Sequence, residues 1–318
     1  YRYKEMLTHK RTLLASALLL VFSSSIAAWA QRLPSGVHPE HYTLLLTPDL
    51  KAATFTGTET IDVVLDHPGK VITLNAAEIE FLSVTAGAQT AQVSLDPGKE
   101  QATFTFPQAL PAGKTTLDIR YKGILNDKLR GFYLSKTAKR NYAVTQFEPT
   151  DARRAFPSFD EPALKATFDI ALTVDRGDTV ISNTNIVSDK PAPDKKHTIK
   201  FAIVAFLVGD FQCTKGSSDG VPIRACATPD KVKLTKFAVE SAEYILHYYD
   251  TYFGIKYPMP KLDMVALPDF EAGAMENFGC ITYRETDLLL DSKTASIPEK
   301  KNVAAVVAHE MAHQWFGD

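Results

Sequence analysis

The sequence lacks an excess of charge of either sign, and it has no internal repeats and no low-complexity segments. Its 35 Lys and Arg residues and 37 Asp and Glu residues leave a net charge of −2 at pH 7. No basic cluster dominates any segment, which argues against a nucleic-acid-binding protein and against a polybasic membrane-surface protein. The composition is that of an ordinary globular protein, 45% hydrophobic and 23% charged over 318 residues. This length predicts two domains or one large one.

Long apolar runs are also missing, apart from one short run at residues 13–22. It follows the first methionine, Met6, and a basic segment at 9–11, and it precedes a small-residue segment at 28–30. About ten apolar residues are too few to span a hydrocarbon layer of about 30 Å, so a secretory signal is favoured over a membrane anchor. The expectation is cleavage after Ala30, a secreted or periplasmic protein without a stable membrane span, and an upstream extension at 1–5.

Cysteines are scarce, with three in the whole sequence. Cys213 and Cys226 flank a turn-rich segment at 216–220 that is typical of a hairpin. In an oxidising compartment this pair can form a disulfide and leave Cys280 free. Three buried thiols are the alternative, because two neighbouring strands need not place their cysteines in bridging geometry. The sequence leaves both arrangements open.

Alternating apolar and polar residues predict β-structure from residue 42 to about 227. Two clear alternations lie at 61–65 and 117–121, and turn residues such as those at 67–69 separate the runs. Many short strands spaced in this way indicate a large antiparallel β-domain of sandwich or saddle type. We assign this domain to residues 31–228.

The apolar period becomes helical after the predicted boundary at residue 228. A helix is predicted over 231–253, with Thr228 as N-cap, Pro229 at the first helical position and Gly254 just beyond the end. A strand-like segment follows at 261–267. Residues 229–318 are therefore predicted to open an α+β domain.

The final helix is predicted to begin near Ser296, whose spacing from Glu299 is that of a capping box. His309 and His313 lie four residues apart on this helix, so their imidazoles project from one face, one turn apart. Two such imidazoles are able to bind one Zn²⁺, and Glu310 lies where a carboxylate can act as the general base of a metallopeptidase. An amphipathic helix that merely carries two exposed histidines is the alternative.

Two further segments carry a family resemblance. Residues 270–279 read FEAGAMENFG, and residues 145–162 contain TQFE followed by DARRAFPSFDEP. Together with His-Glu-x-x-His at 309–313, these ordered motifs resemble the aminopeptidase N family of gluzincin zinc aminopeptidases over roughly residues 33–318. The connection after residue 200 departs from the family pattern, because it is shorter than expected.

The resemblance implies a multidomain α+β fold, with an N-terminal β saddle followed by the beginning of a thermolysin-like catalytic domain. It implies that Glu276 receives the free α-ammonium of a peptide substrate, that Glu148 is a second carboxylate contact, and that Gln146 lies nearby. Taken singly, such glutamates are more often solvated surface residues. The substrate contacts implied by the resemblance come from both segments: Gln146, Glu148, Gly273, Ala274, Met275, Glu276 and Asn277.

The resemblance also implies one zinc ion held by His309, His313 and a glutamate beyond Asp318, with Glu310 as the base. We therefore expect an N-terminal fragment that is inactive by itself and part of an enzyme that removes N-terminal residues from peptides. Two alternatives stay open: a bifunctional epoxide hydrolase and aminopeptidase, against which Ala274 argues mildly, and a non-catalytic scaffold of the family. The preferred first residue and the oligomeric state are not readable.

Overall fold

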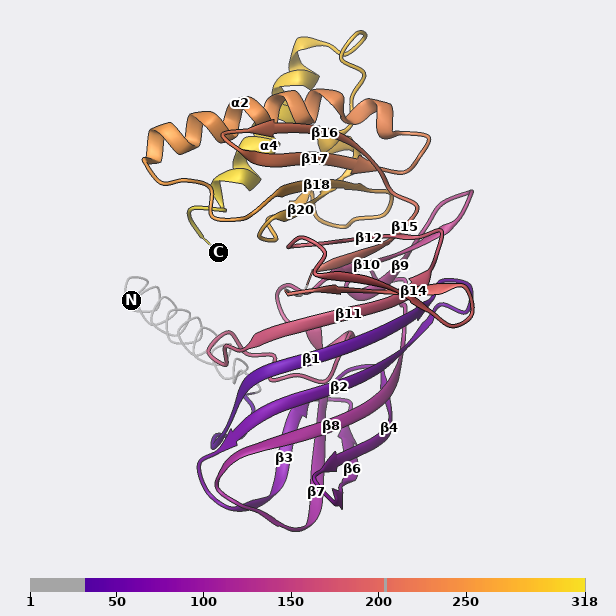
Figure 1. Ribbon diagram of the computed structural model, residues 1–318, viewed down its shortest axis with the longest axis vertical. Helices are drawn as coiled ribbons and strands as arrows, with labels where there is room; N and C mark the ends of the chain where they lie inside the picture. Colours follow the sequence, from indigo (N-terminus) through magenta and orange to yellow (C-terminus); the bar gives the residue numbers. More distant parts are fainter. Residues whose placement is uncertain (1–31, 203–204, 318) are drawn as a thin grey trace, which may run out of the picture. The chain divides into compact units, whose positions relative to one another are not determined.

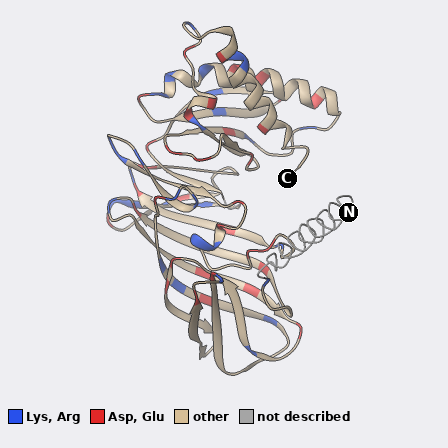
Figure 2. Ribbon diagram, turned by 180° about the vertical axis from the view of Figure 1, so that it is seen from behind, with Lys and Arg blue, Asp and Glu red and all other residues tan. Residues whose placement is uncertain are grey.

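The computed structural model describes residues 32–202 and 205–317, and strands dominate these ranges (Figure 1). The predicted signal peptide and upstream extension lie outside the described residues, so secretion stays a prediction. Within the described ranges, no helix is both long and apolar enough to cross a membrane. Acidic and basic residues are interspersed along the described ribbon, in keeping with the balanced composition (Figure 2).

The largest sheet has the strand order β13-β14-β11-β1-β2-β8-β4-β5. Its central strands follow the predicted alternation, since β2 buries Ile61, Val63 and Leu65 and leaves the residues between them partly exposed. One pair departs from the antiparallel arrangement, because β1 and β11 run parallel. The strands are β1 (Val37–Asp49), β2 (Thr54–Leu65), β4 (Ile79–Ala86), β5 (Gln89–Thr90), β8 (Gly113–Ile124), β11 (Thr167–Asp175), β13 (Ser188–Ala192) and β14 (Lys196–Phe201).

Two smaller sheets complete the N-terminal part. The first has the order β3-β7-β6, and Phe104 of β7 meets Phe81 of β4 edge to face, with ring centroids 5.4 Å apart. The second has the order β12-β15-β10-β9. The connection after residue 200 is shorter than the family pattern predicts, but both flanking strands, β14 and β15, are present. The strands are β3 (Gly69–Asn75), β6 (Gln92–Asp96), β7 (Gln101–Leu110), β9 (Gly131–Lys136), β10 (Asn141–Gln146), β12 (Thr179–Ser182) and β15 (Phe206–Gly209).

A mixed sheet of order β16-β17-β18-β20-β19 carries the C-terminal part. Because β17 pairs with β18, residues 212–227 share a sheet with strands that follow the predicted boundary at 228. That boundary stays a prediction. The strands are β16 (Gln212–Ser218), β17 (Val221–Ala227), β18 (Leu262–Leu267), β19 (Ala274–Met275) and β20 (Cys280–Arg284).

The predicted hairpin forms, and its two cysteines are joined. Cys213 of β16 lies opposite Cys226 of β17, and the structure holds a disulfide between them. Cys280 is a free, fully buried thiol whose pKa burial raises to about 12. Disulfides are typical of oxidising compartments, which agrees with the predicted export without testing it.

The helix predicted over 231–253 forms, but it begins later than expected. A 3₁₀ turn, η2 (Val232–Thr235), comes first, and the α-helix α2 (Lys236–Phe253) has Thr235 as its N-cap. Thr228 is therefore not the N-cap; its carbonyl accepts hydrogen bonds from the amides of Lys231 and Val232 and opens the turn. Gly254 ends α2 in the left-handed region, with φ of 65°, as predicted.

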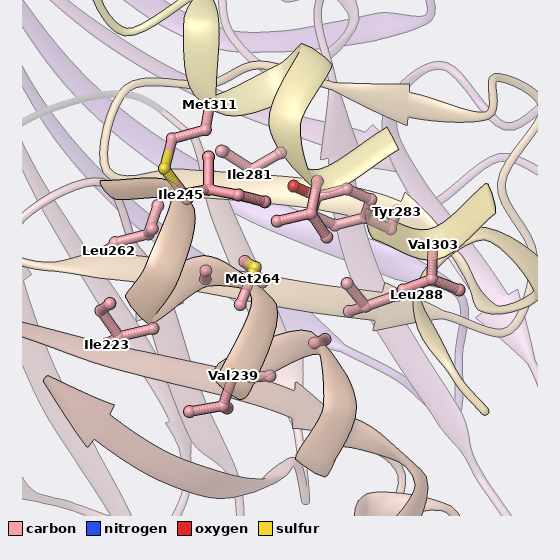
Figure 3. Packing of buried hydrophobic residues seen from close by; sticks show 14 of the residues in the cluster. Ile223, Val239, Ile245, Leu262, Met264, Ile281, Tyr283, Leu288, Val303 and Met311 are labelled. Atoms are coloured by element: carbon pink, nitrogen blue, oxygen red, sulfur yellow. The ribbon is translucent and has the colours of Figure 1, made fainter. Parts of the chain in front are cut away.

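The five-stranded sheet is buried on both faces. One face packs against α2 and α4 (Ile297–Ala312) (Figure 3). The other packs against the β12-β15-β10-β9 sheet. The short helix η1 (Ala152–Arg154) lies between β10 and β11, and α3 (Glu285–Leu288) lies between β20 and α4. Residues of the first cluster include Val239, Ile245, Met264, Ile281, Val303 and Met311, and those of the second include Tyr133, Val144, Leu207, Val265 and Leu267.

One acid lies inside the largest sheet without a visible role. Glu59 of β2 is fully buried, and in the described part of the chain neither carboxylate oxygen has a hydrogen-bond partner. Tyr42 and Tyr121 are close enough for the charge of Glu59 to contribute to their raised pKa values, which are caused mainly by burial. Burial also raises the pKa of Glu59 well above its ordinary value of 4.5.

We expect Glu59→Gln to stabilise the protein at neutral pH. The folded chain keeps the Glu59 proton at pH values where the unfolded chain has lost it, so the free energy of unfolding falls as pH rises above about 4.5. The neutral amide removes this fall, and the gain at pH 7 should be on the order of 1–3 kcal/mol. Urea unfolding between pH 4 and 8 measures it, with exposed Glu80→Gln as the control. Parallel pH profiles for wild type and Glu59→Gln would contradict the prediction.

Candidate active site

The helix α4 carries His309 and Glu310 of the His-Glu-x-x-His motif, and His313 is its C-cap. It begins at the predicted capping box, in which the Ser296 amide donates to Glu299 Oε2 at 2.7 Å and the Glu299 amide donates to Ser296 Oγ at 3.4 Å. The helical repeat then buries Val303, Val307 and Met311 against the sheet. The motif at 309–313 is therefore held at the end of a helix that is fixed along its length.

The two histidines converge on one point. His309 Nε2 and His313 Nε2 are 3.4 Å apart. His313 Nδ1 lies 3.1 Å from the Phe316 carbonyl oxygen, which can only accept, so Nδ1 is the donor. In the neutral ring this leaves the lone pair on Nε2, the atom that faces His309. The backbone thus selects the tautomer that a metal ligand requires.

The pair fits two positions of a tetrahedral zinc site. Zn–N bonds of about 2.0–2.1 Å place two ligand nitrogens roughly 3.3–3.4 Å apart at a tetrahedral centre. The observed separation of 3.4 Å meets this requirement. Over 32–202 and 205–317 no cluster of three or more His, Cys, Asp or Glu side chains is arranged to hold a metal. Among the described residues, His309 and His313 are thus a pair of candidate ligands.

Glu310 lies on the buried side of the motif. The residue is 7% exposed, whereas His309 is exposed and His313 is partly exposed. Its charge contributes to the raised pKa of Tyr283, although burial of that phenol is the larger cause. The Tyr283 hydroxyl is buried and has no hydrogen-bond partner within the described chain. The Glu310 side chain is therefore largely shielded from solvent.

The predicted amine-binding segment is a hairpin. Its strand β19 pairs with β20, with Ala274 opposite Tyr283, and Glu276 follows at the turn. Gly279 ends the turn with φ of 67°, and a Cβ there would lie 2.4 Å from the Asn183 carbonyl oxygen. Only glycine satisfies both the backbone conformation and the close approach. The turn is thus fixed by its sequence and by a neighbouring strand connection.

The hairpin brings Glu276 to the motif. Glu276 Oε1 lies 3.9 Å from His313 Nδ1, and its side chain is 21% exposed. The Gln314 side chain, one residue past His313, accepts from the Gly279 amide at 3.0 Å and donates to the Glu276 carbonyl at 2.9 Å. The structure therefore brings Glu276 close to His313, whose ring also meets that of His309.

The other hairpin residues are placed as follows. The carbonyl of exposed Gly273 accepts from the Arg284 amide at 2.8 Å, so that oxygen is already engaged in the sheet. Ala274 and Asn277 are partly buried, and the Asn277 carbonyl accepts from the Cys280 amide at 2.9 Å. Met275 is buried in the cluster between the sheets.

Of the two predicted site residues in the segment 145–148, Gln146 contacts the hairpin. Gln146, the last residue of β10, places Nε2 3.4 Å from Met275 Sδ, and its Oε1 is buried without a partner among the described residues. Glu148 is exposed two residues further on, before a cis peptide bond to Pro149. Gln146 is therefore in contact with the hairpin at Met275, and Glu148 extends from the same chain segment.

Three residues near the site were missed by the sequence analysis as functional: Asn183, Lys261 and Gln314. Asn183 Nδ2 donates to the Phe278 carbonyl at 2.8 Å. Lys261 Nζ donates to the Gly279 carbonyl at 2.9 Å and to Asp263 Oδ2 at 2.7 Å. The contacts of Asn183 with Phe278 and of Lys261 with Gly279 join segments 95 and 18 residues apart, so no local sequence pattern predicts them.

Comparison with known proteins decides the family. The model of the peptidase M1 N-terminal domain matches residues 38–204, and that of the peptidase family M1 domain matches 237–318. The chain belongs to peptidase family M1. The M1 chain is 42% identical over 300 residues to Aminopeptidase 2 of Candida albicans, covering 90% of this chain and 32% of that protein. It is 38% identical over 315 residues to the puromycin-sensitive aminopeptidase of Caenorhabditis elegans, covering 92% and 33%.

A plant relative shows a similar identity and a similar coverage. Aminopeptidase M1-A of Oryza sativa subsp. japonica is 42% identical over 308 residues, which cover 90% of this chain and 35% of that protein. The M1 chain thus spans about a third of the length of these relatives. The resemblance drawn from the motifs is confirmed at the level of the family.

Proposed function

We propose that the protein is a zinc aminopeptidase that removes single residues from the free N-terminus of peptides. The observation that carries the proposal is the position of the Glu276 carboxylate. Its Oε1 lies 3.9 Å from Nδ1 of His313, and Nε2 of the same ring lies 3.4 Å from His309 Nε2. A carboxylate this close to a metal-binding pair suits a substrate whose ammonium lies one residue from the bond to be cut. The names of the relatives, all aminopeptidases, support the same reaction.

The histidines and Glu310 have separate tasks in this proposal. His309 and His313 hold the ion through Nε2, and the Phe316 carbonyl keeps His313 in the required tautomer. Zn²⁺ bound at this position supplies Lewis acidity, which polarises a carbonyl group and lowers the pKa of water. Glu310 accepts a proton from the attacking water and delivers it to the leaving amine. A third protein ligand completes the site and is predicted to follow residue 318.

The hairpin and the 145–148 segment select the substrate. Glu276 accepts charge-assisted hydrogen bonds from the α-ammonium, and Glu148 and Gln146 add acceptors from the second segment. The backbone at Gly273 and Ala274 runs alongside the bound peptide. Because the ammonium is held at a fixed distance from the metal ligands, only the first peptide bond reaches the reacting position. This arrangement distinguishes an exopeptidase from an endopeptidase.

The proposal is tested by metal binding in the full-length protein. His309→Ala and His313→Ala should each weaken Zn²⁺ binding by more than about 100-fold, since loss of a ligand exceeds the 10–100-fold effect of losing an outer partner. Hydrolysis of alanyl p-nitroanilide should be lost in parallel. His247→Ala, an exposed histidine of α2 paired with Asp219, is the control. Zinc affinity equal to that of wild type in both variants would remove these residues from the metal site.

A further inference from the structure

Gln314 connects the two halves of the proposed site. It directly follows His313 and is 2% exposed. Its Oε1 accepts from the Gly279 amide at 3.0 Å and lies 3.4 Å from the Tyr257 hydroxyl, and its Nε2 donates to the Glu276 carbonyl at 2.9 Å. One side chain therefore spans the turn of the amine-binding hairpin from Glu276 to Gly279.

The contacts require an amide of this length. The hairpin offers a donor at Gly279 and an acceptor at Glu276, so the side chain between them must both accept and donate. A glutamate only accepts when ionised, and a methionine of similar length does neither well. Losing the amide would leave a buried N–H and a carbonyl of the turn without their partner, which favours movement of the turn.

We propose that Gln314 is a positioning residue that fixes the amine-binding Glu276 at its distance from the metal-binding His313. The inference rests on the proposed function, because it assigns Gln314 to the spacing between the two groups. The Gln314 side chain donates to the main-chain carbonyl of Glu276. Because Gln314 directly follows His313, this bond fixes the position of the Glu276 carboxylate relative to His313. The histidine tautomer is set separately, by the Phe316 carbonyl. Gln314 therefore acts on amine binding and not on metal binding.

Two small hydroxamates separate these effects in the full-length enzyme. Acetohydroxamate binds through the metal alone, whereas alanine hydroxamate adds a free α-amine for Glu276. In wild type the alanine compound should bind more tightly. In Gln314→Met its inhibition constant should rise by about tenfold, as expected for the loss of one to two buried hydrogen bonds. The inhibition constant of acetohydroxamate and the zinc content should stay within about twofold of wild type.

A second variant and a direct readout guard against misfolding. Gln314→Glu keeps the bond from the Gly279 amide but loses donation to the Glu276 carbonyl, so it should also reduce the preference for the alanine compound. Hydrogen exchange at the Gly279 amide should accelerate in Gln314→Met and stay slow in Gln314→Glu. Gln212→Met, at an exposed position in β16, is the matched control and should change neither measurement.

The outcomes distinguish the inference from the function on which it rests. A preference for alanine hydroxamate that is equal in wild type and both Gln314 variants overturns the positioning role and leaves the proposed function intact. The same holds if both hydroxamates weaken equally, because the effect would then be on the metal. Absence of any preference in wild type overturns the amine anchor, and the inference falls with it.

Discussion

Glu310→Gln is expected to lower kcat for alanyl p-nitroanilide by about 10²–10⁴-fold, the usual contribution of a general base. The glutamine matches glutamate in size but cannot accept the proton. Because Glu310 is 7% exposed and lies between residues that pack into the core, the replacement should leave the helix in place. The measurement is steady-state kinetics of the full-length protein, together with its zinc content, which should equal that of wild type.

A matched control lies on the same helix. Glu299→Gln changes the capping box of α4 at the opposite end, where glutamine serves nearly as well as glutamate. It should leave kcat unchanged. If Glu310→Gln kept wild-type turnover with zinc bound, the base would have to be another residue.

Glu276→Gln is expected to reduce kcat/KM for substrates with a free N-terminus by about 30- to 1,000-fold, the range for removing one member of a desolvated charge pair. The hairpin should keep its shape, because the contacts to Gln314 use the Glu276 main chain. The loss should therefore reflect the missing negative charge at the α-ammonium. Kinetics on alanyl p-nitroanilide measure it.

The comparison for this variant is Glu271→Gln, an exposed residue at the start of the same segment. Both changes remove one negative charge near the hairpin, so a general effect of net charge would appear in both. We expect kcat/KM of Glu271→Gln to stay near that of wild type. Equal effects of the two variants would argue against Glu276 as the amine anchor.

Features of the site that depend on short stretches of sequence were predictable. The capping box at Ser296 and Glu299 forms as predicted, and one helical turn brings His309 and His313 together. The alternation in β2 also predicted which side chains are buried. Each of these depends on residues within a few positions of one another, where helix and strand geometry fix the outcome. The role proposed for Glu276 came from resemblance to the family and not from local geometry.

Features that depend on distant segments were not predictable. The parallel pairing of β1 with β11 and the pairing of β17 with β18 join strands whose order no local period determines. The disulfide required the register that places Cys213 opposite Cys226. The prediction of Thr228 as the N-cap was wrong for a local reason instead: its carbonyl opens a 3₁₀ turn before the α-helix begins. Gln314 gives no signal in the sequence, since its partners lie 35 and 38 residues away.

The contacts made by Asn183 and Lys261 bear on how enzymes of this family can be recombined. Both Asn183 and Ser182 lie in the part matched by the N-terminal family model. Asn183 donates to the Phe278 carbonyl in the hairpin, and the Ser182 carbonyl accepts from Lys261, which directly precedes β18. Tyr133 likewise donates to the Asp269 carbonyl at 2.9 Å. A chimera that joins the β-part of one relative to the catalytic part of another would keep these hydrogen bonds only where the donor side chains are kept, because all three acceptors are main-chain carbonyls. Asn183, Lys261 and Tyr133 are therefore the donor side chains to preserve when the two parts are exchanged between relatives.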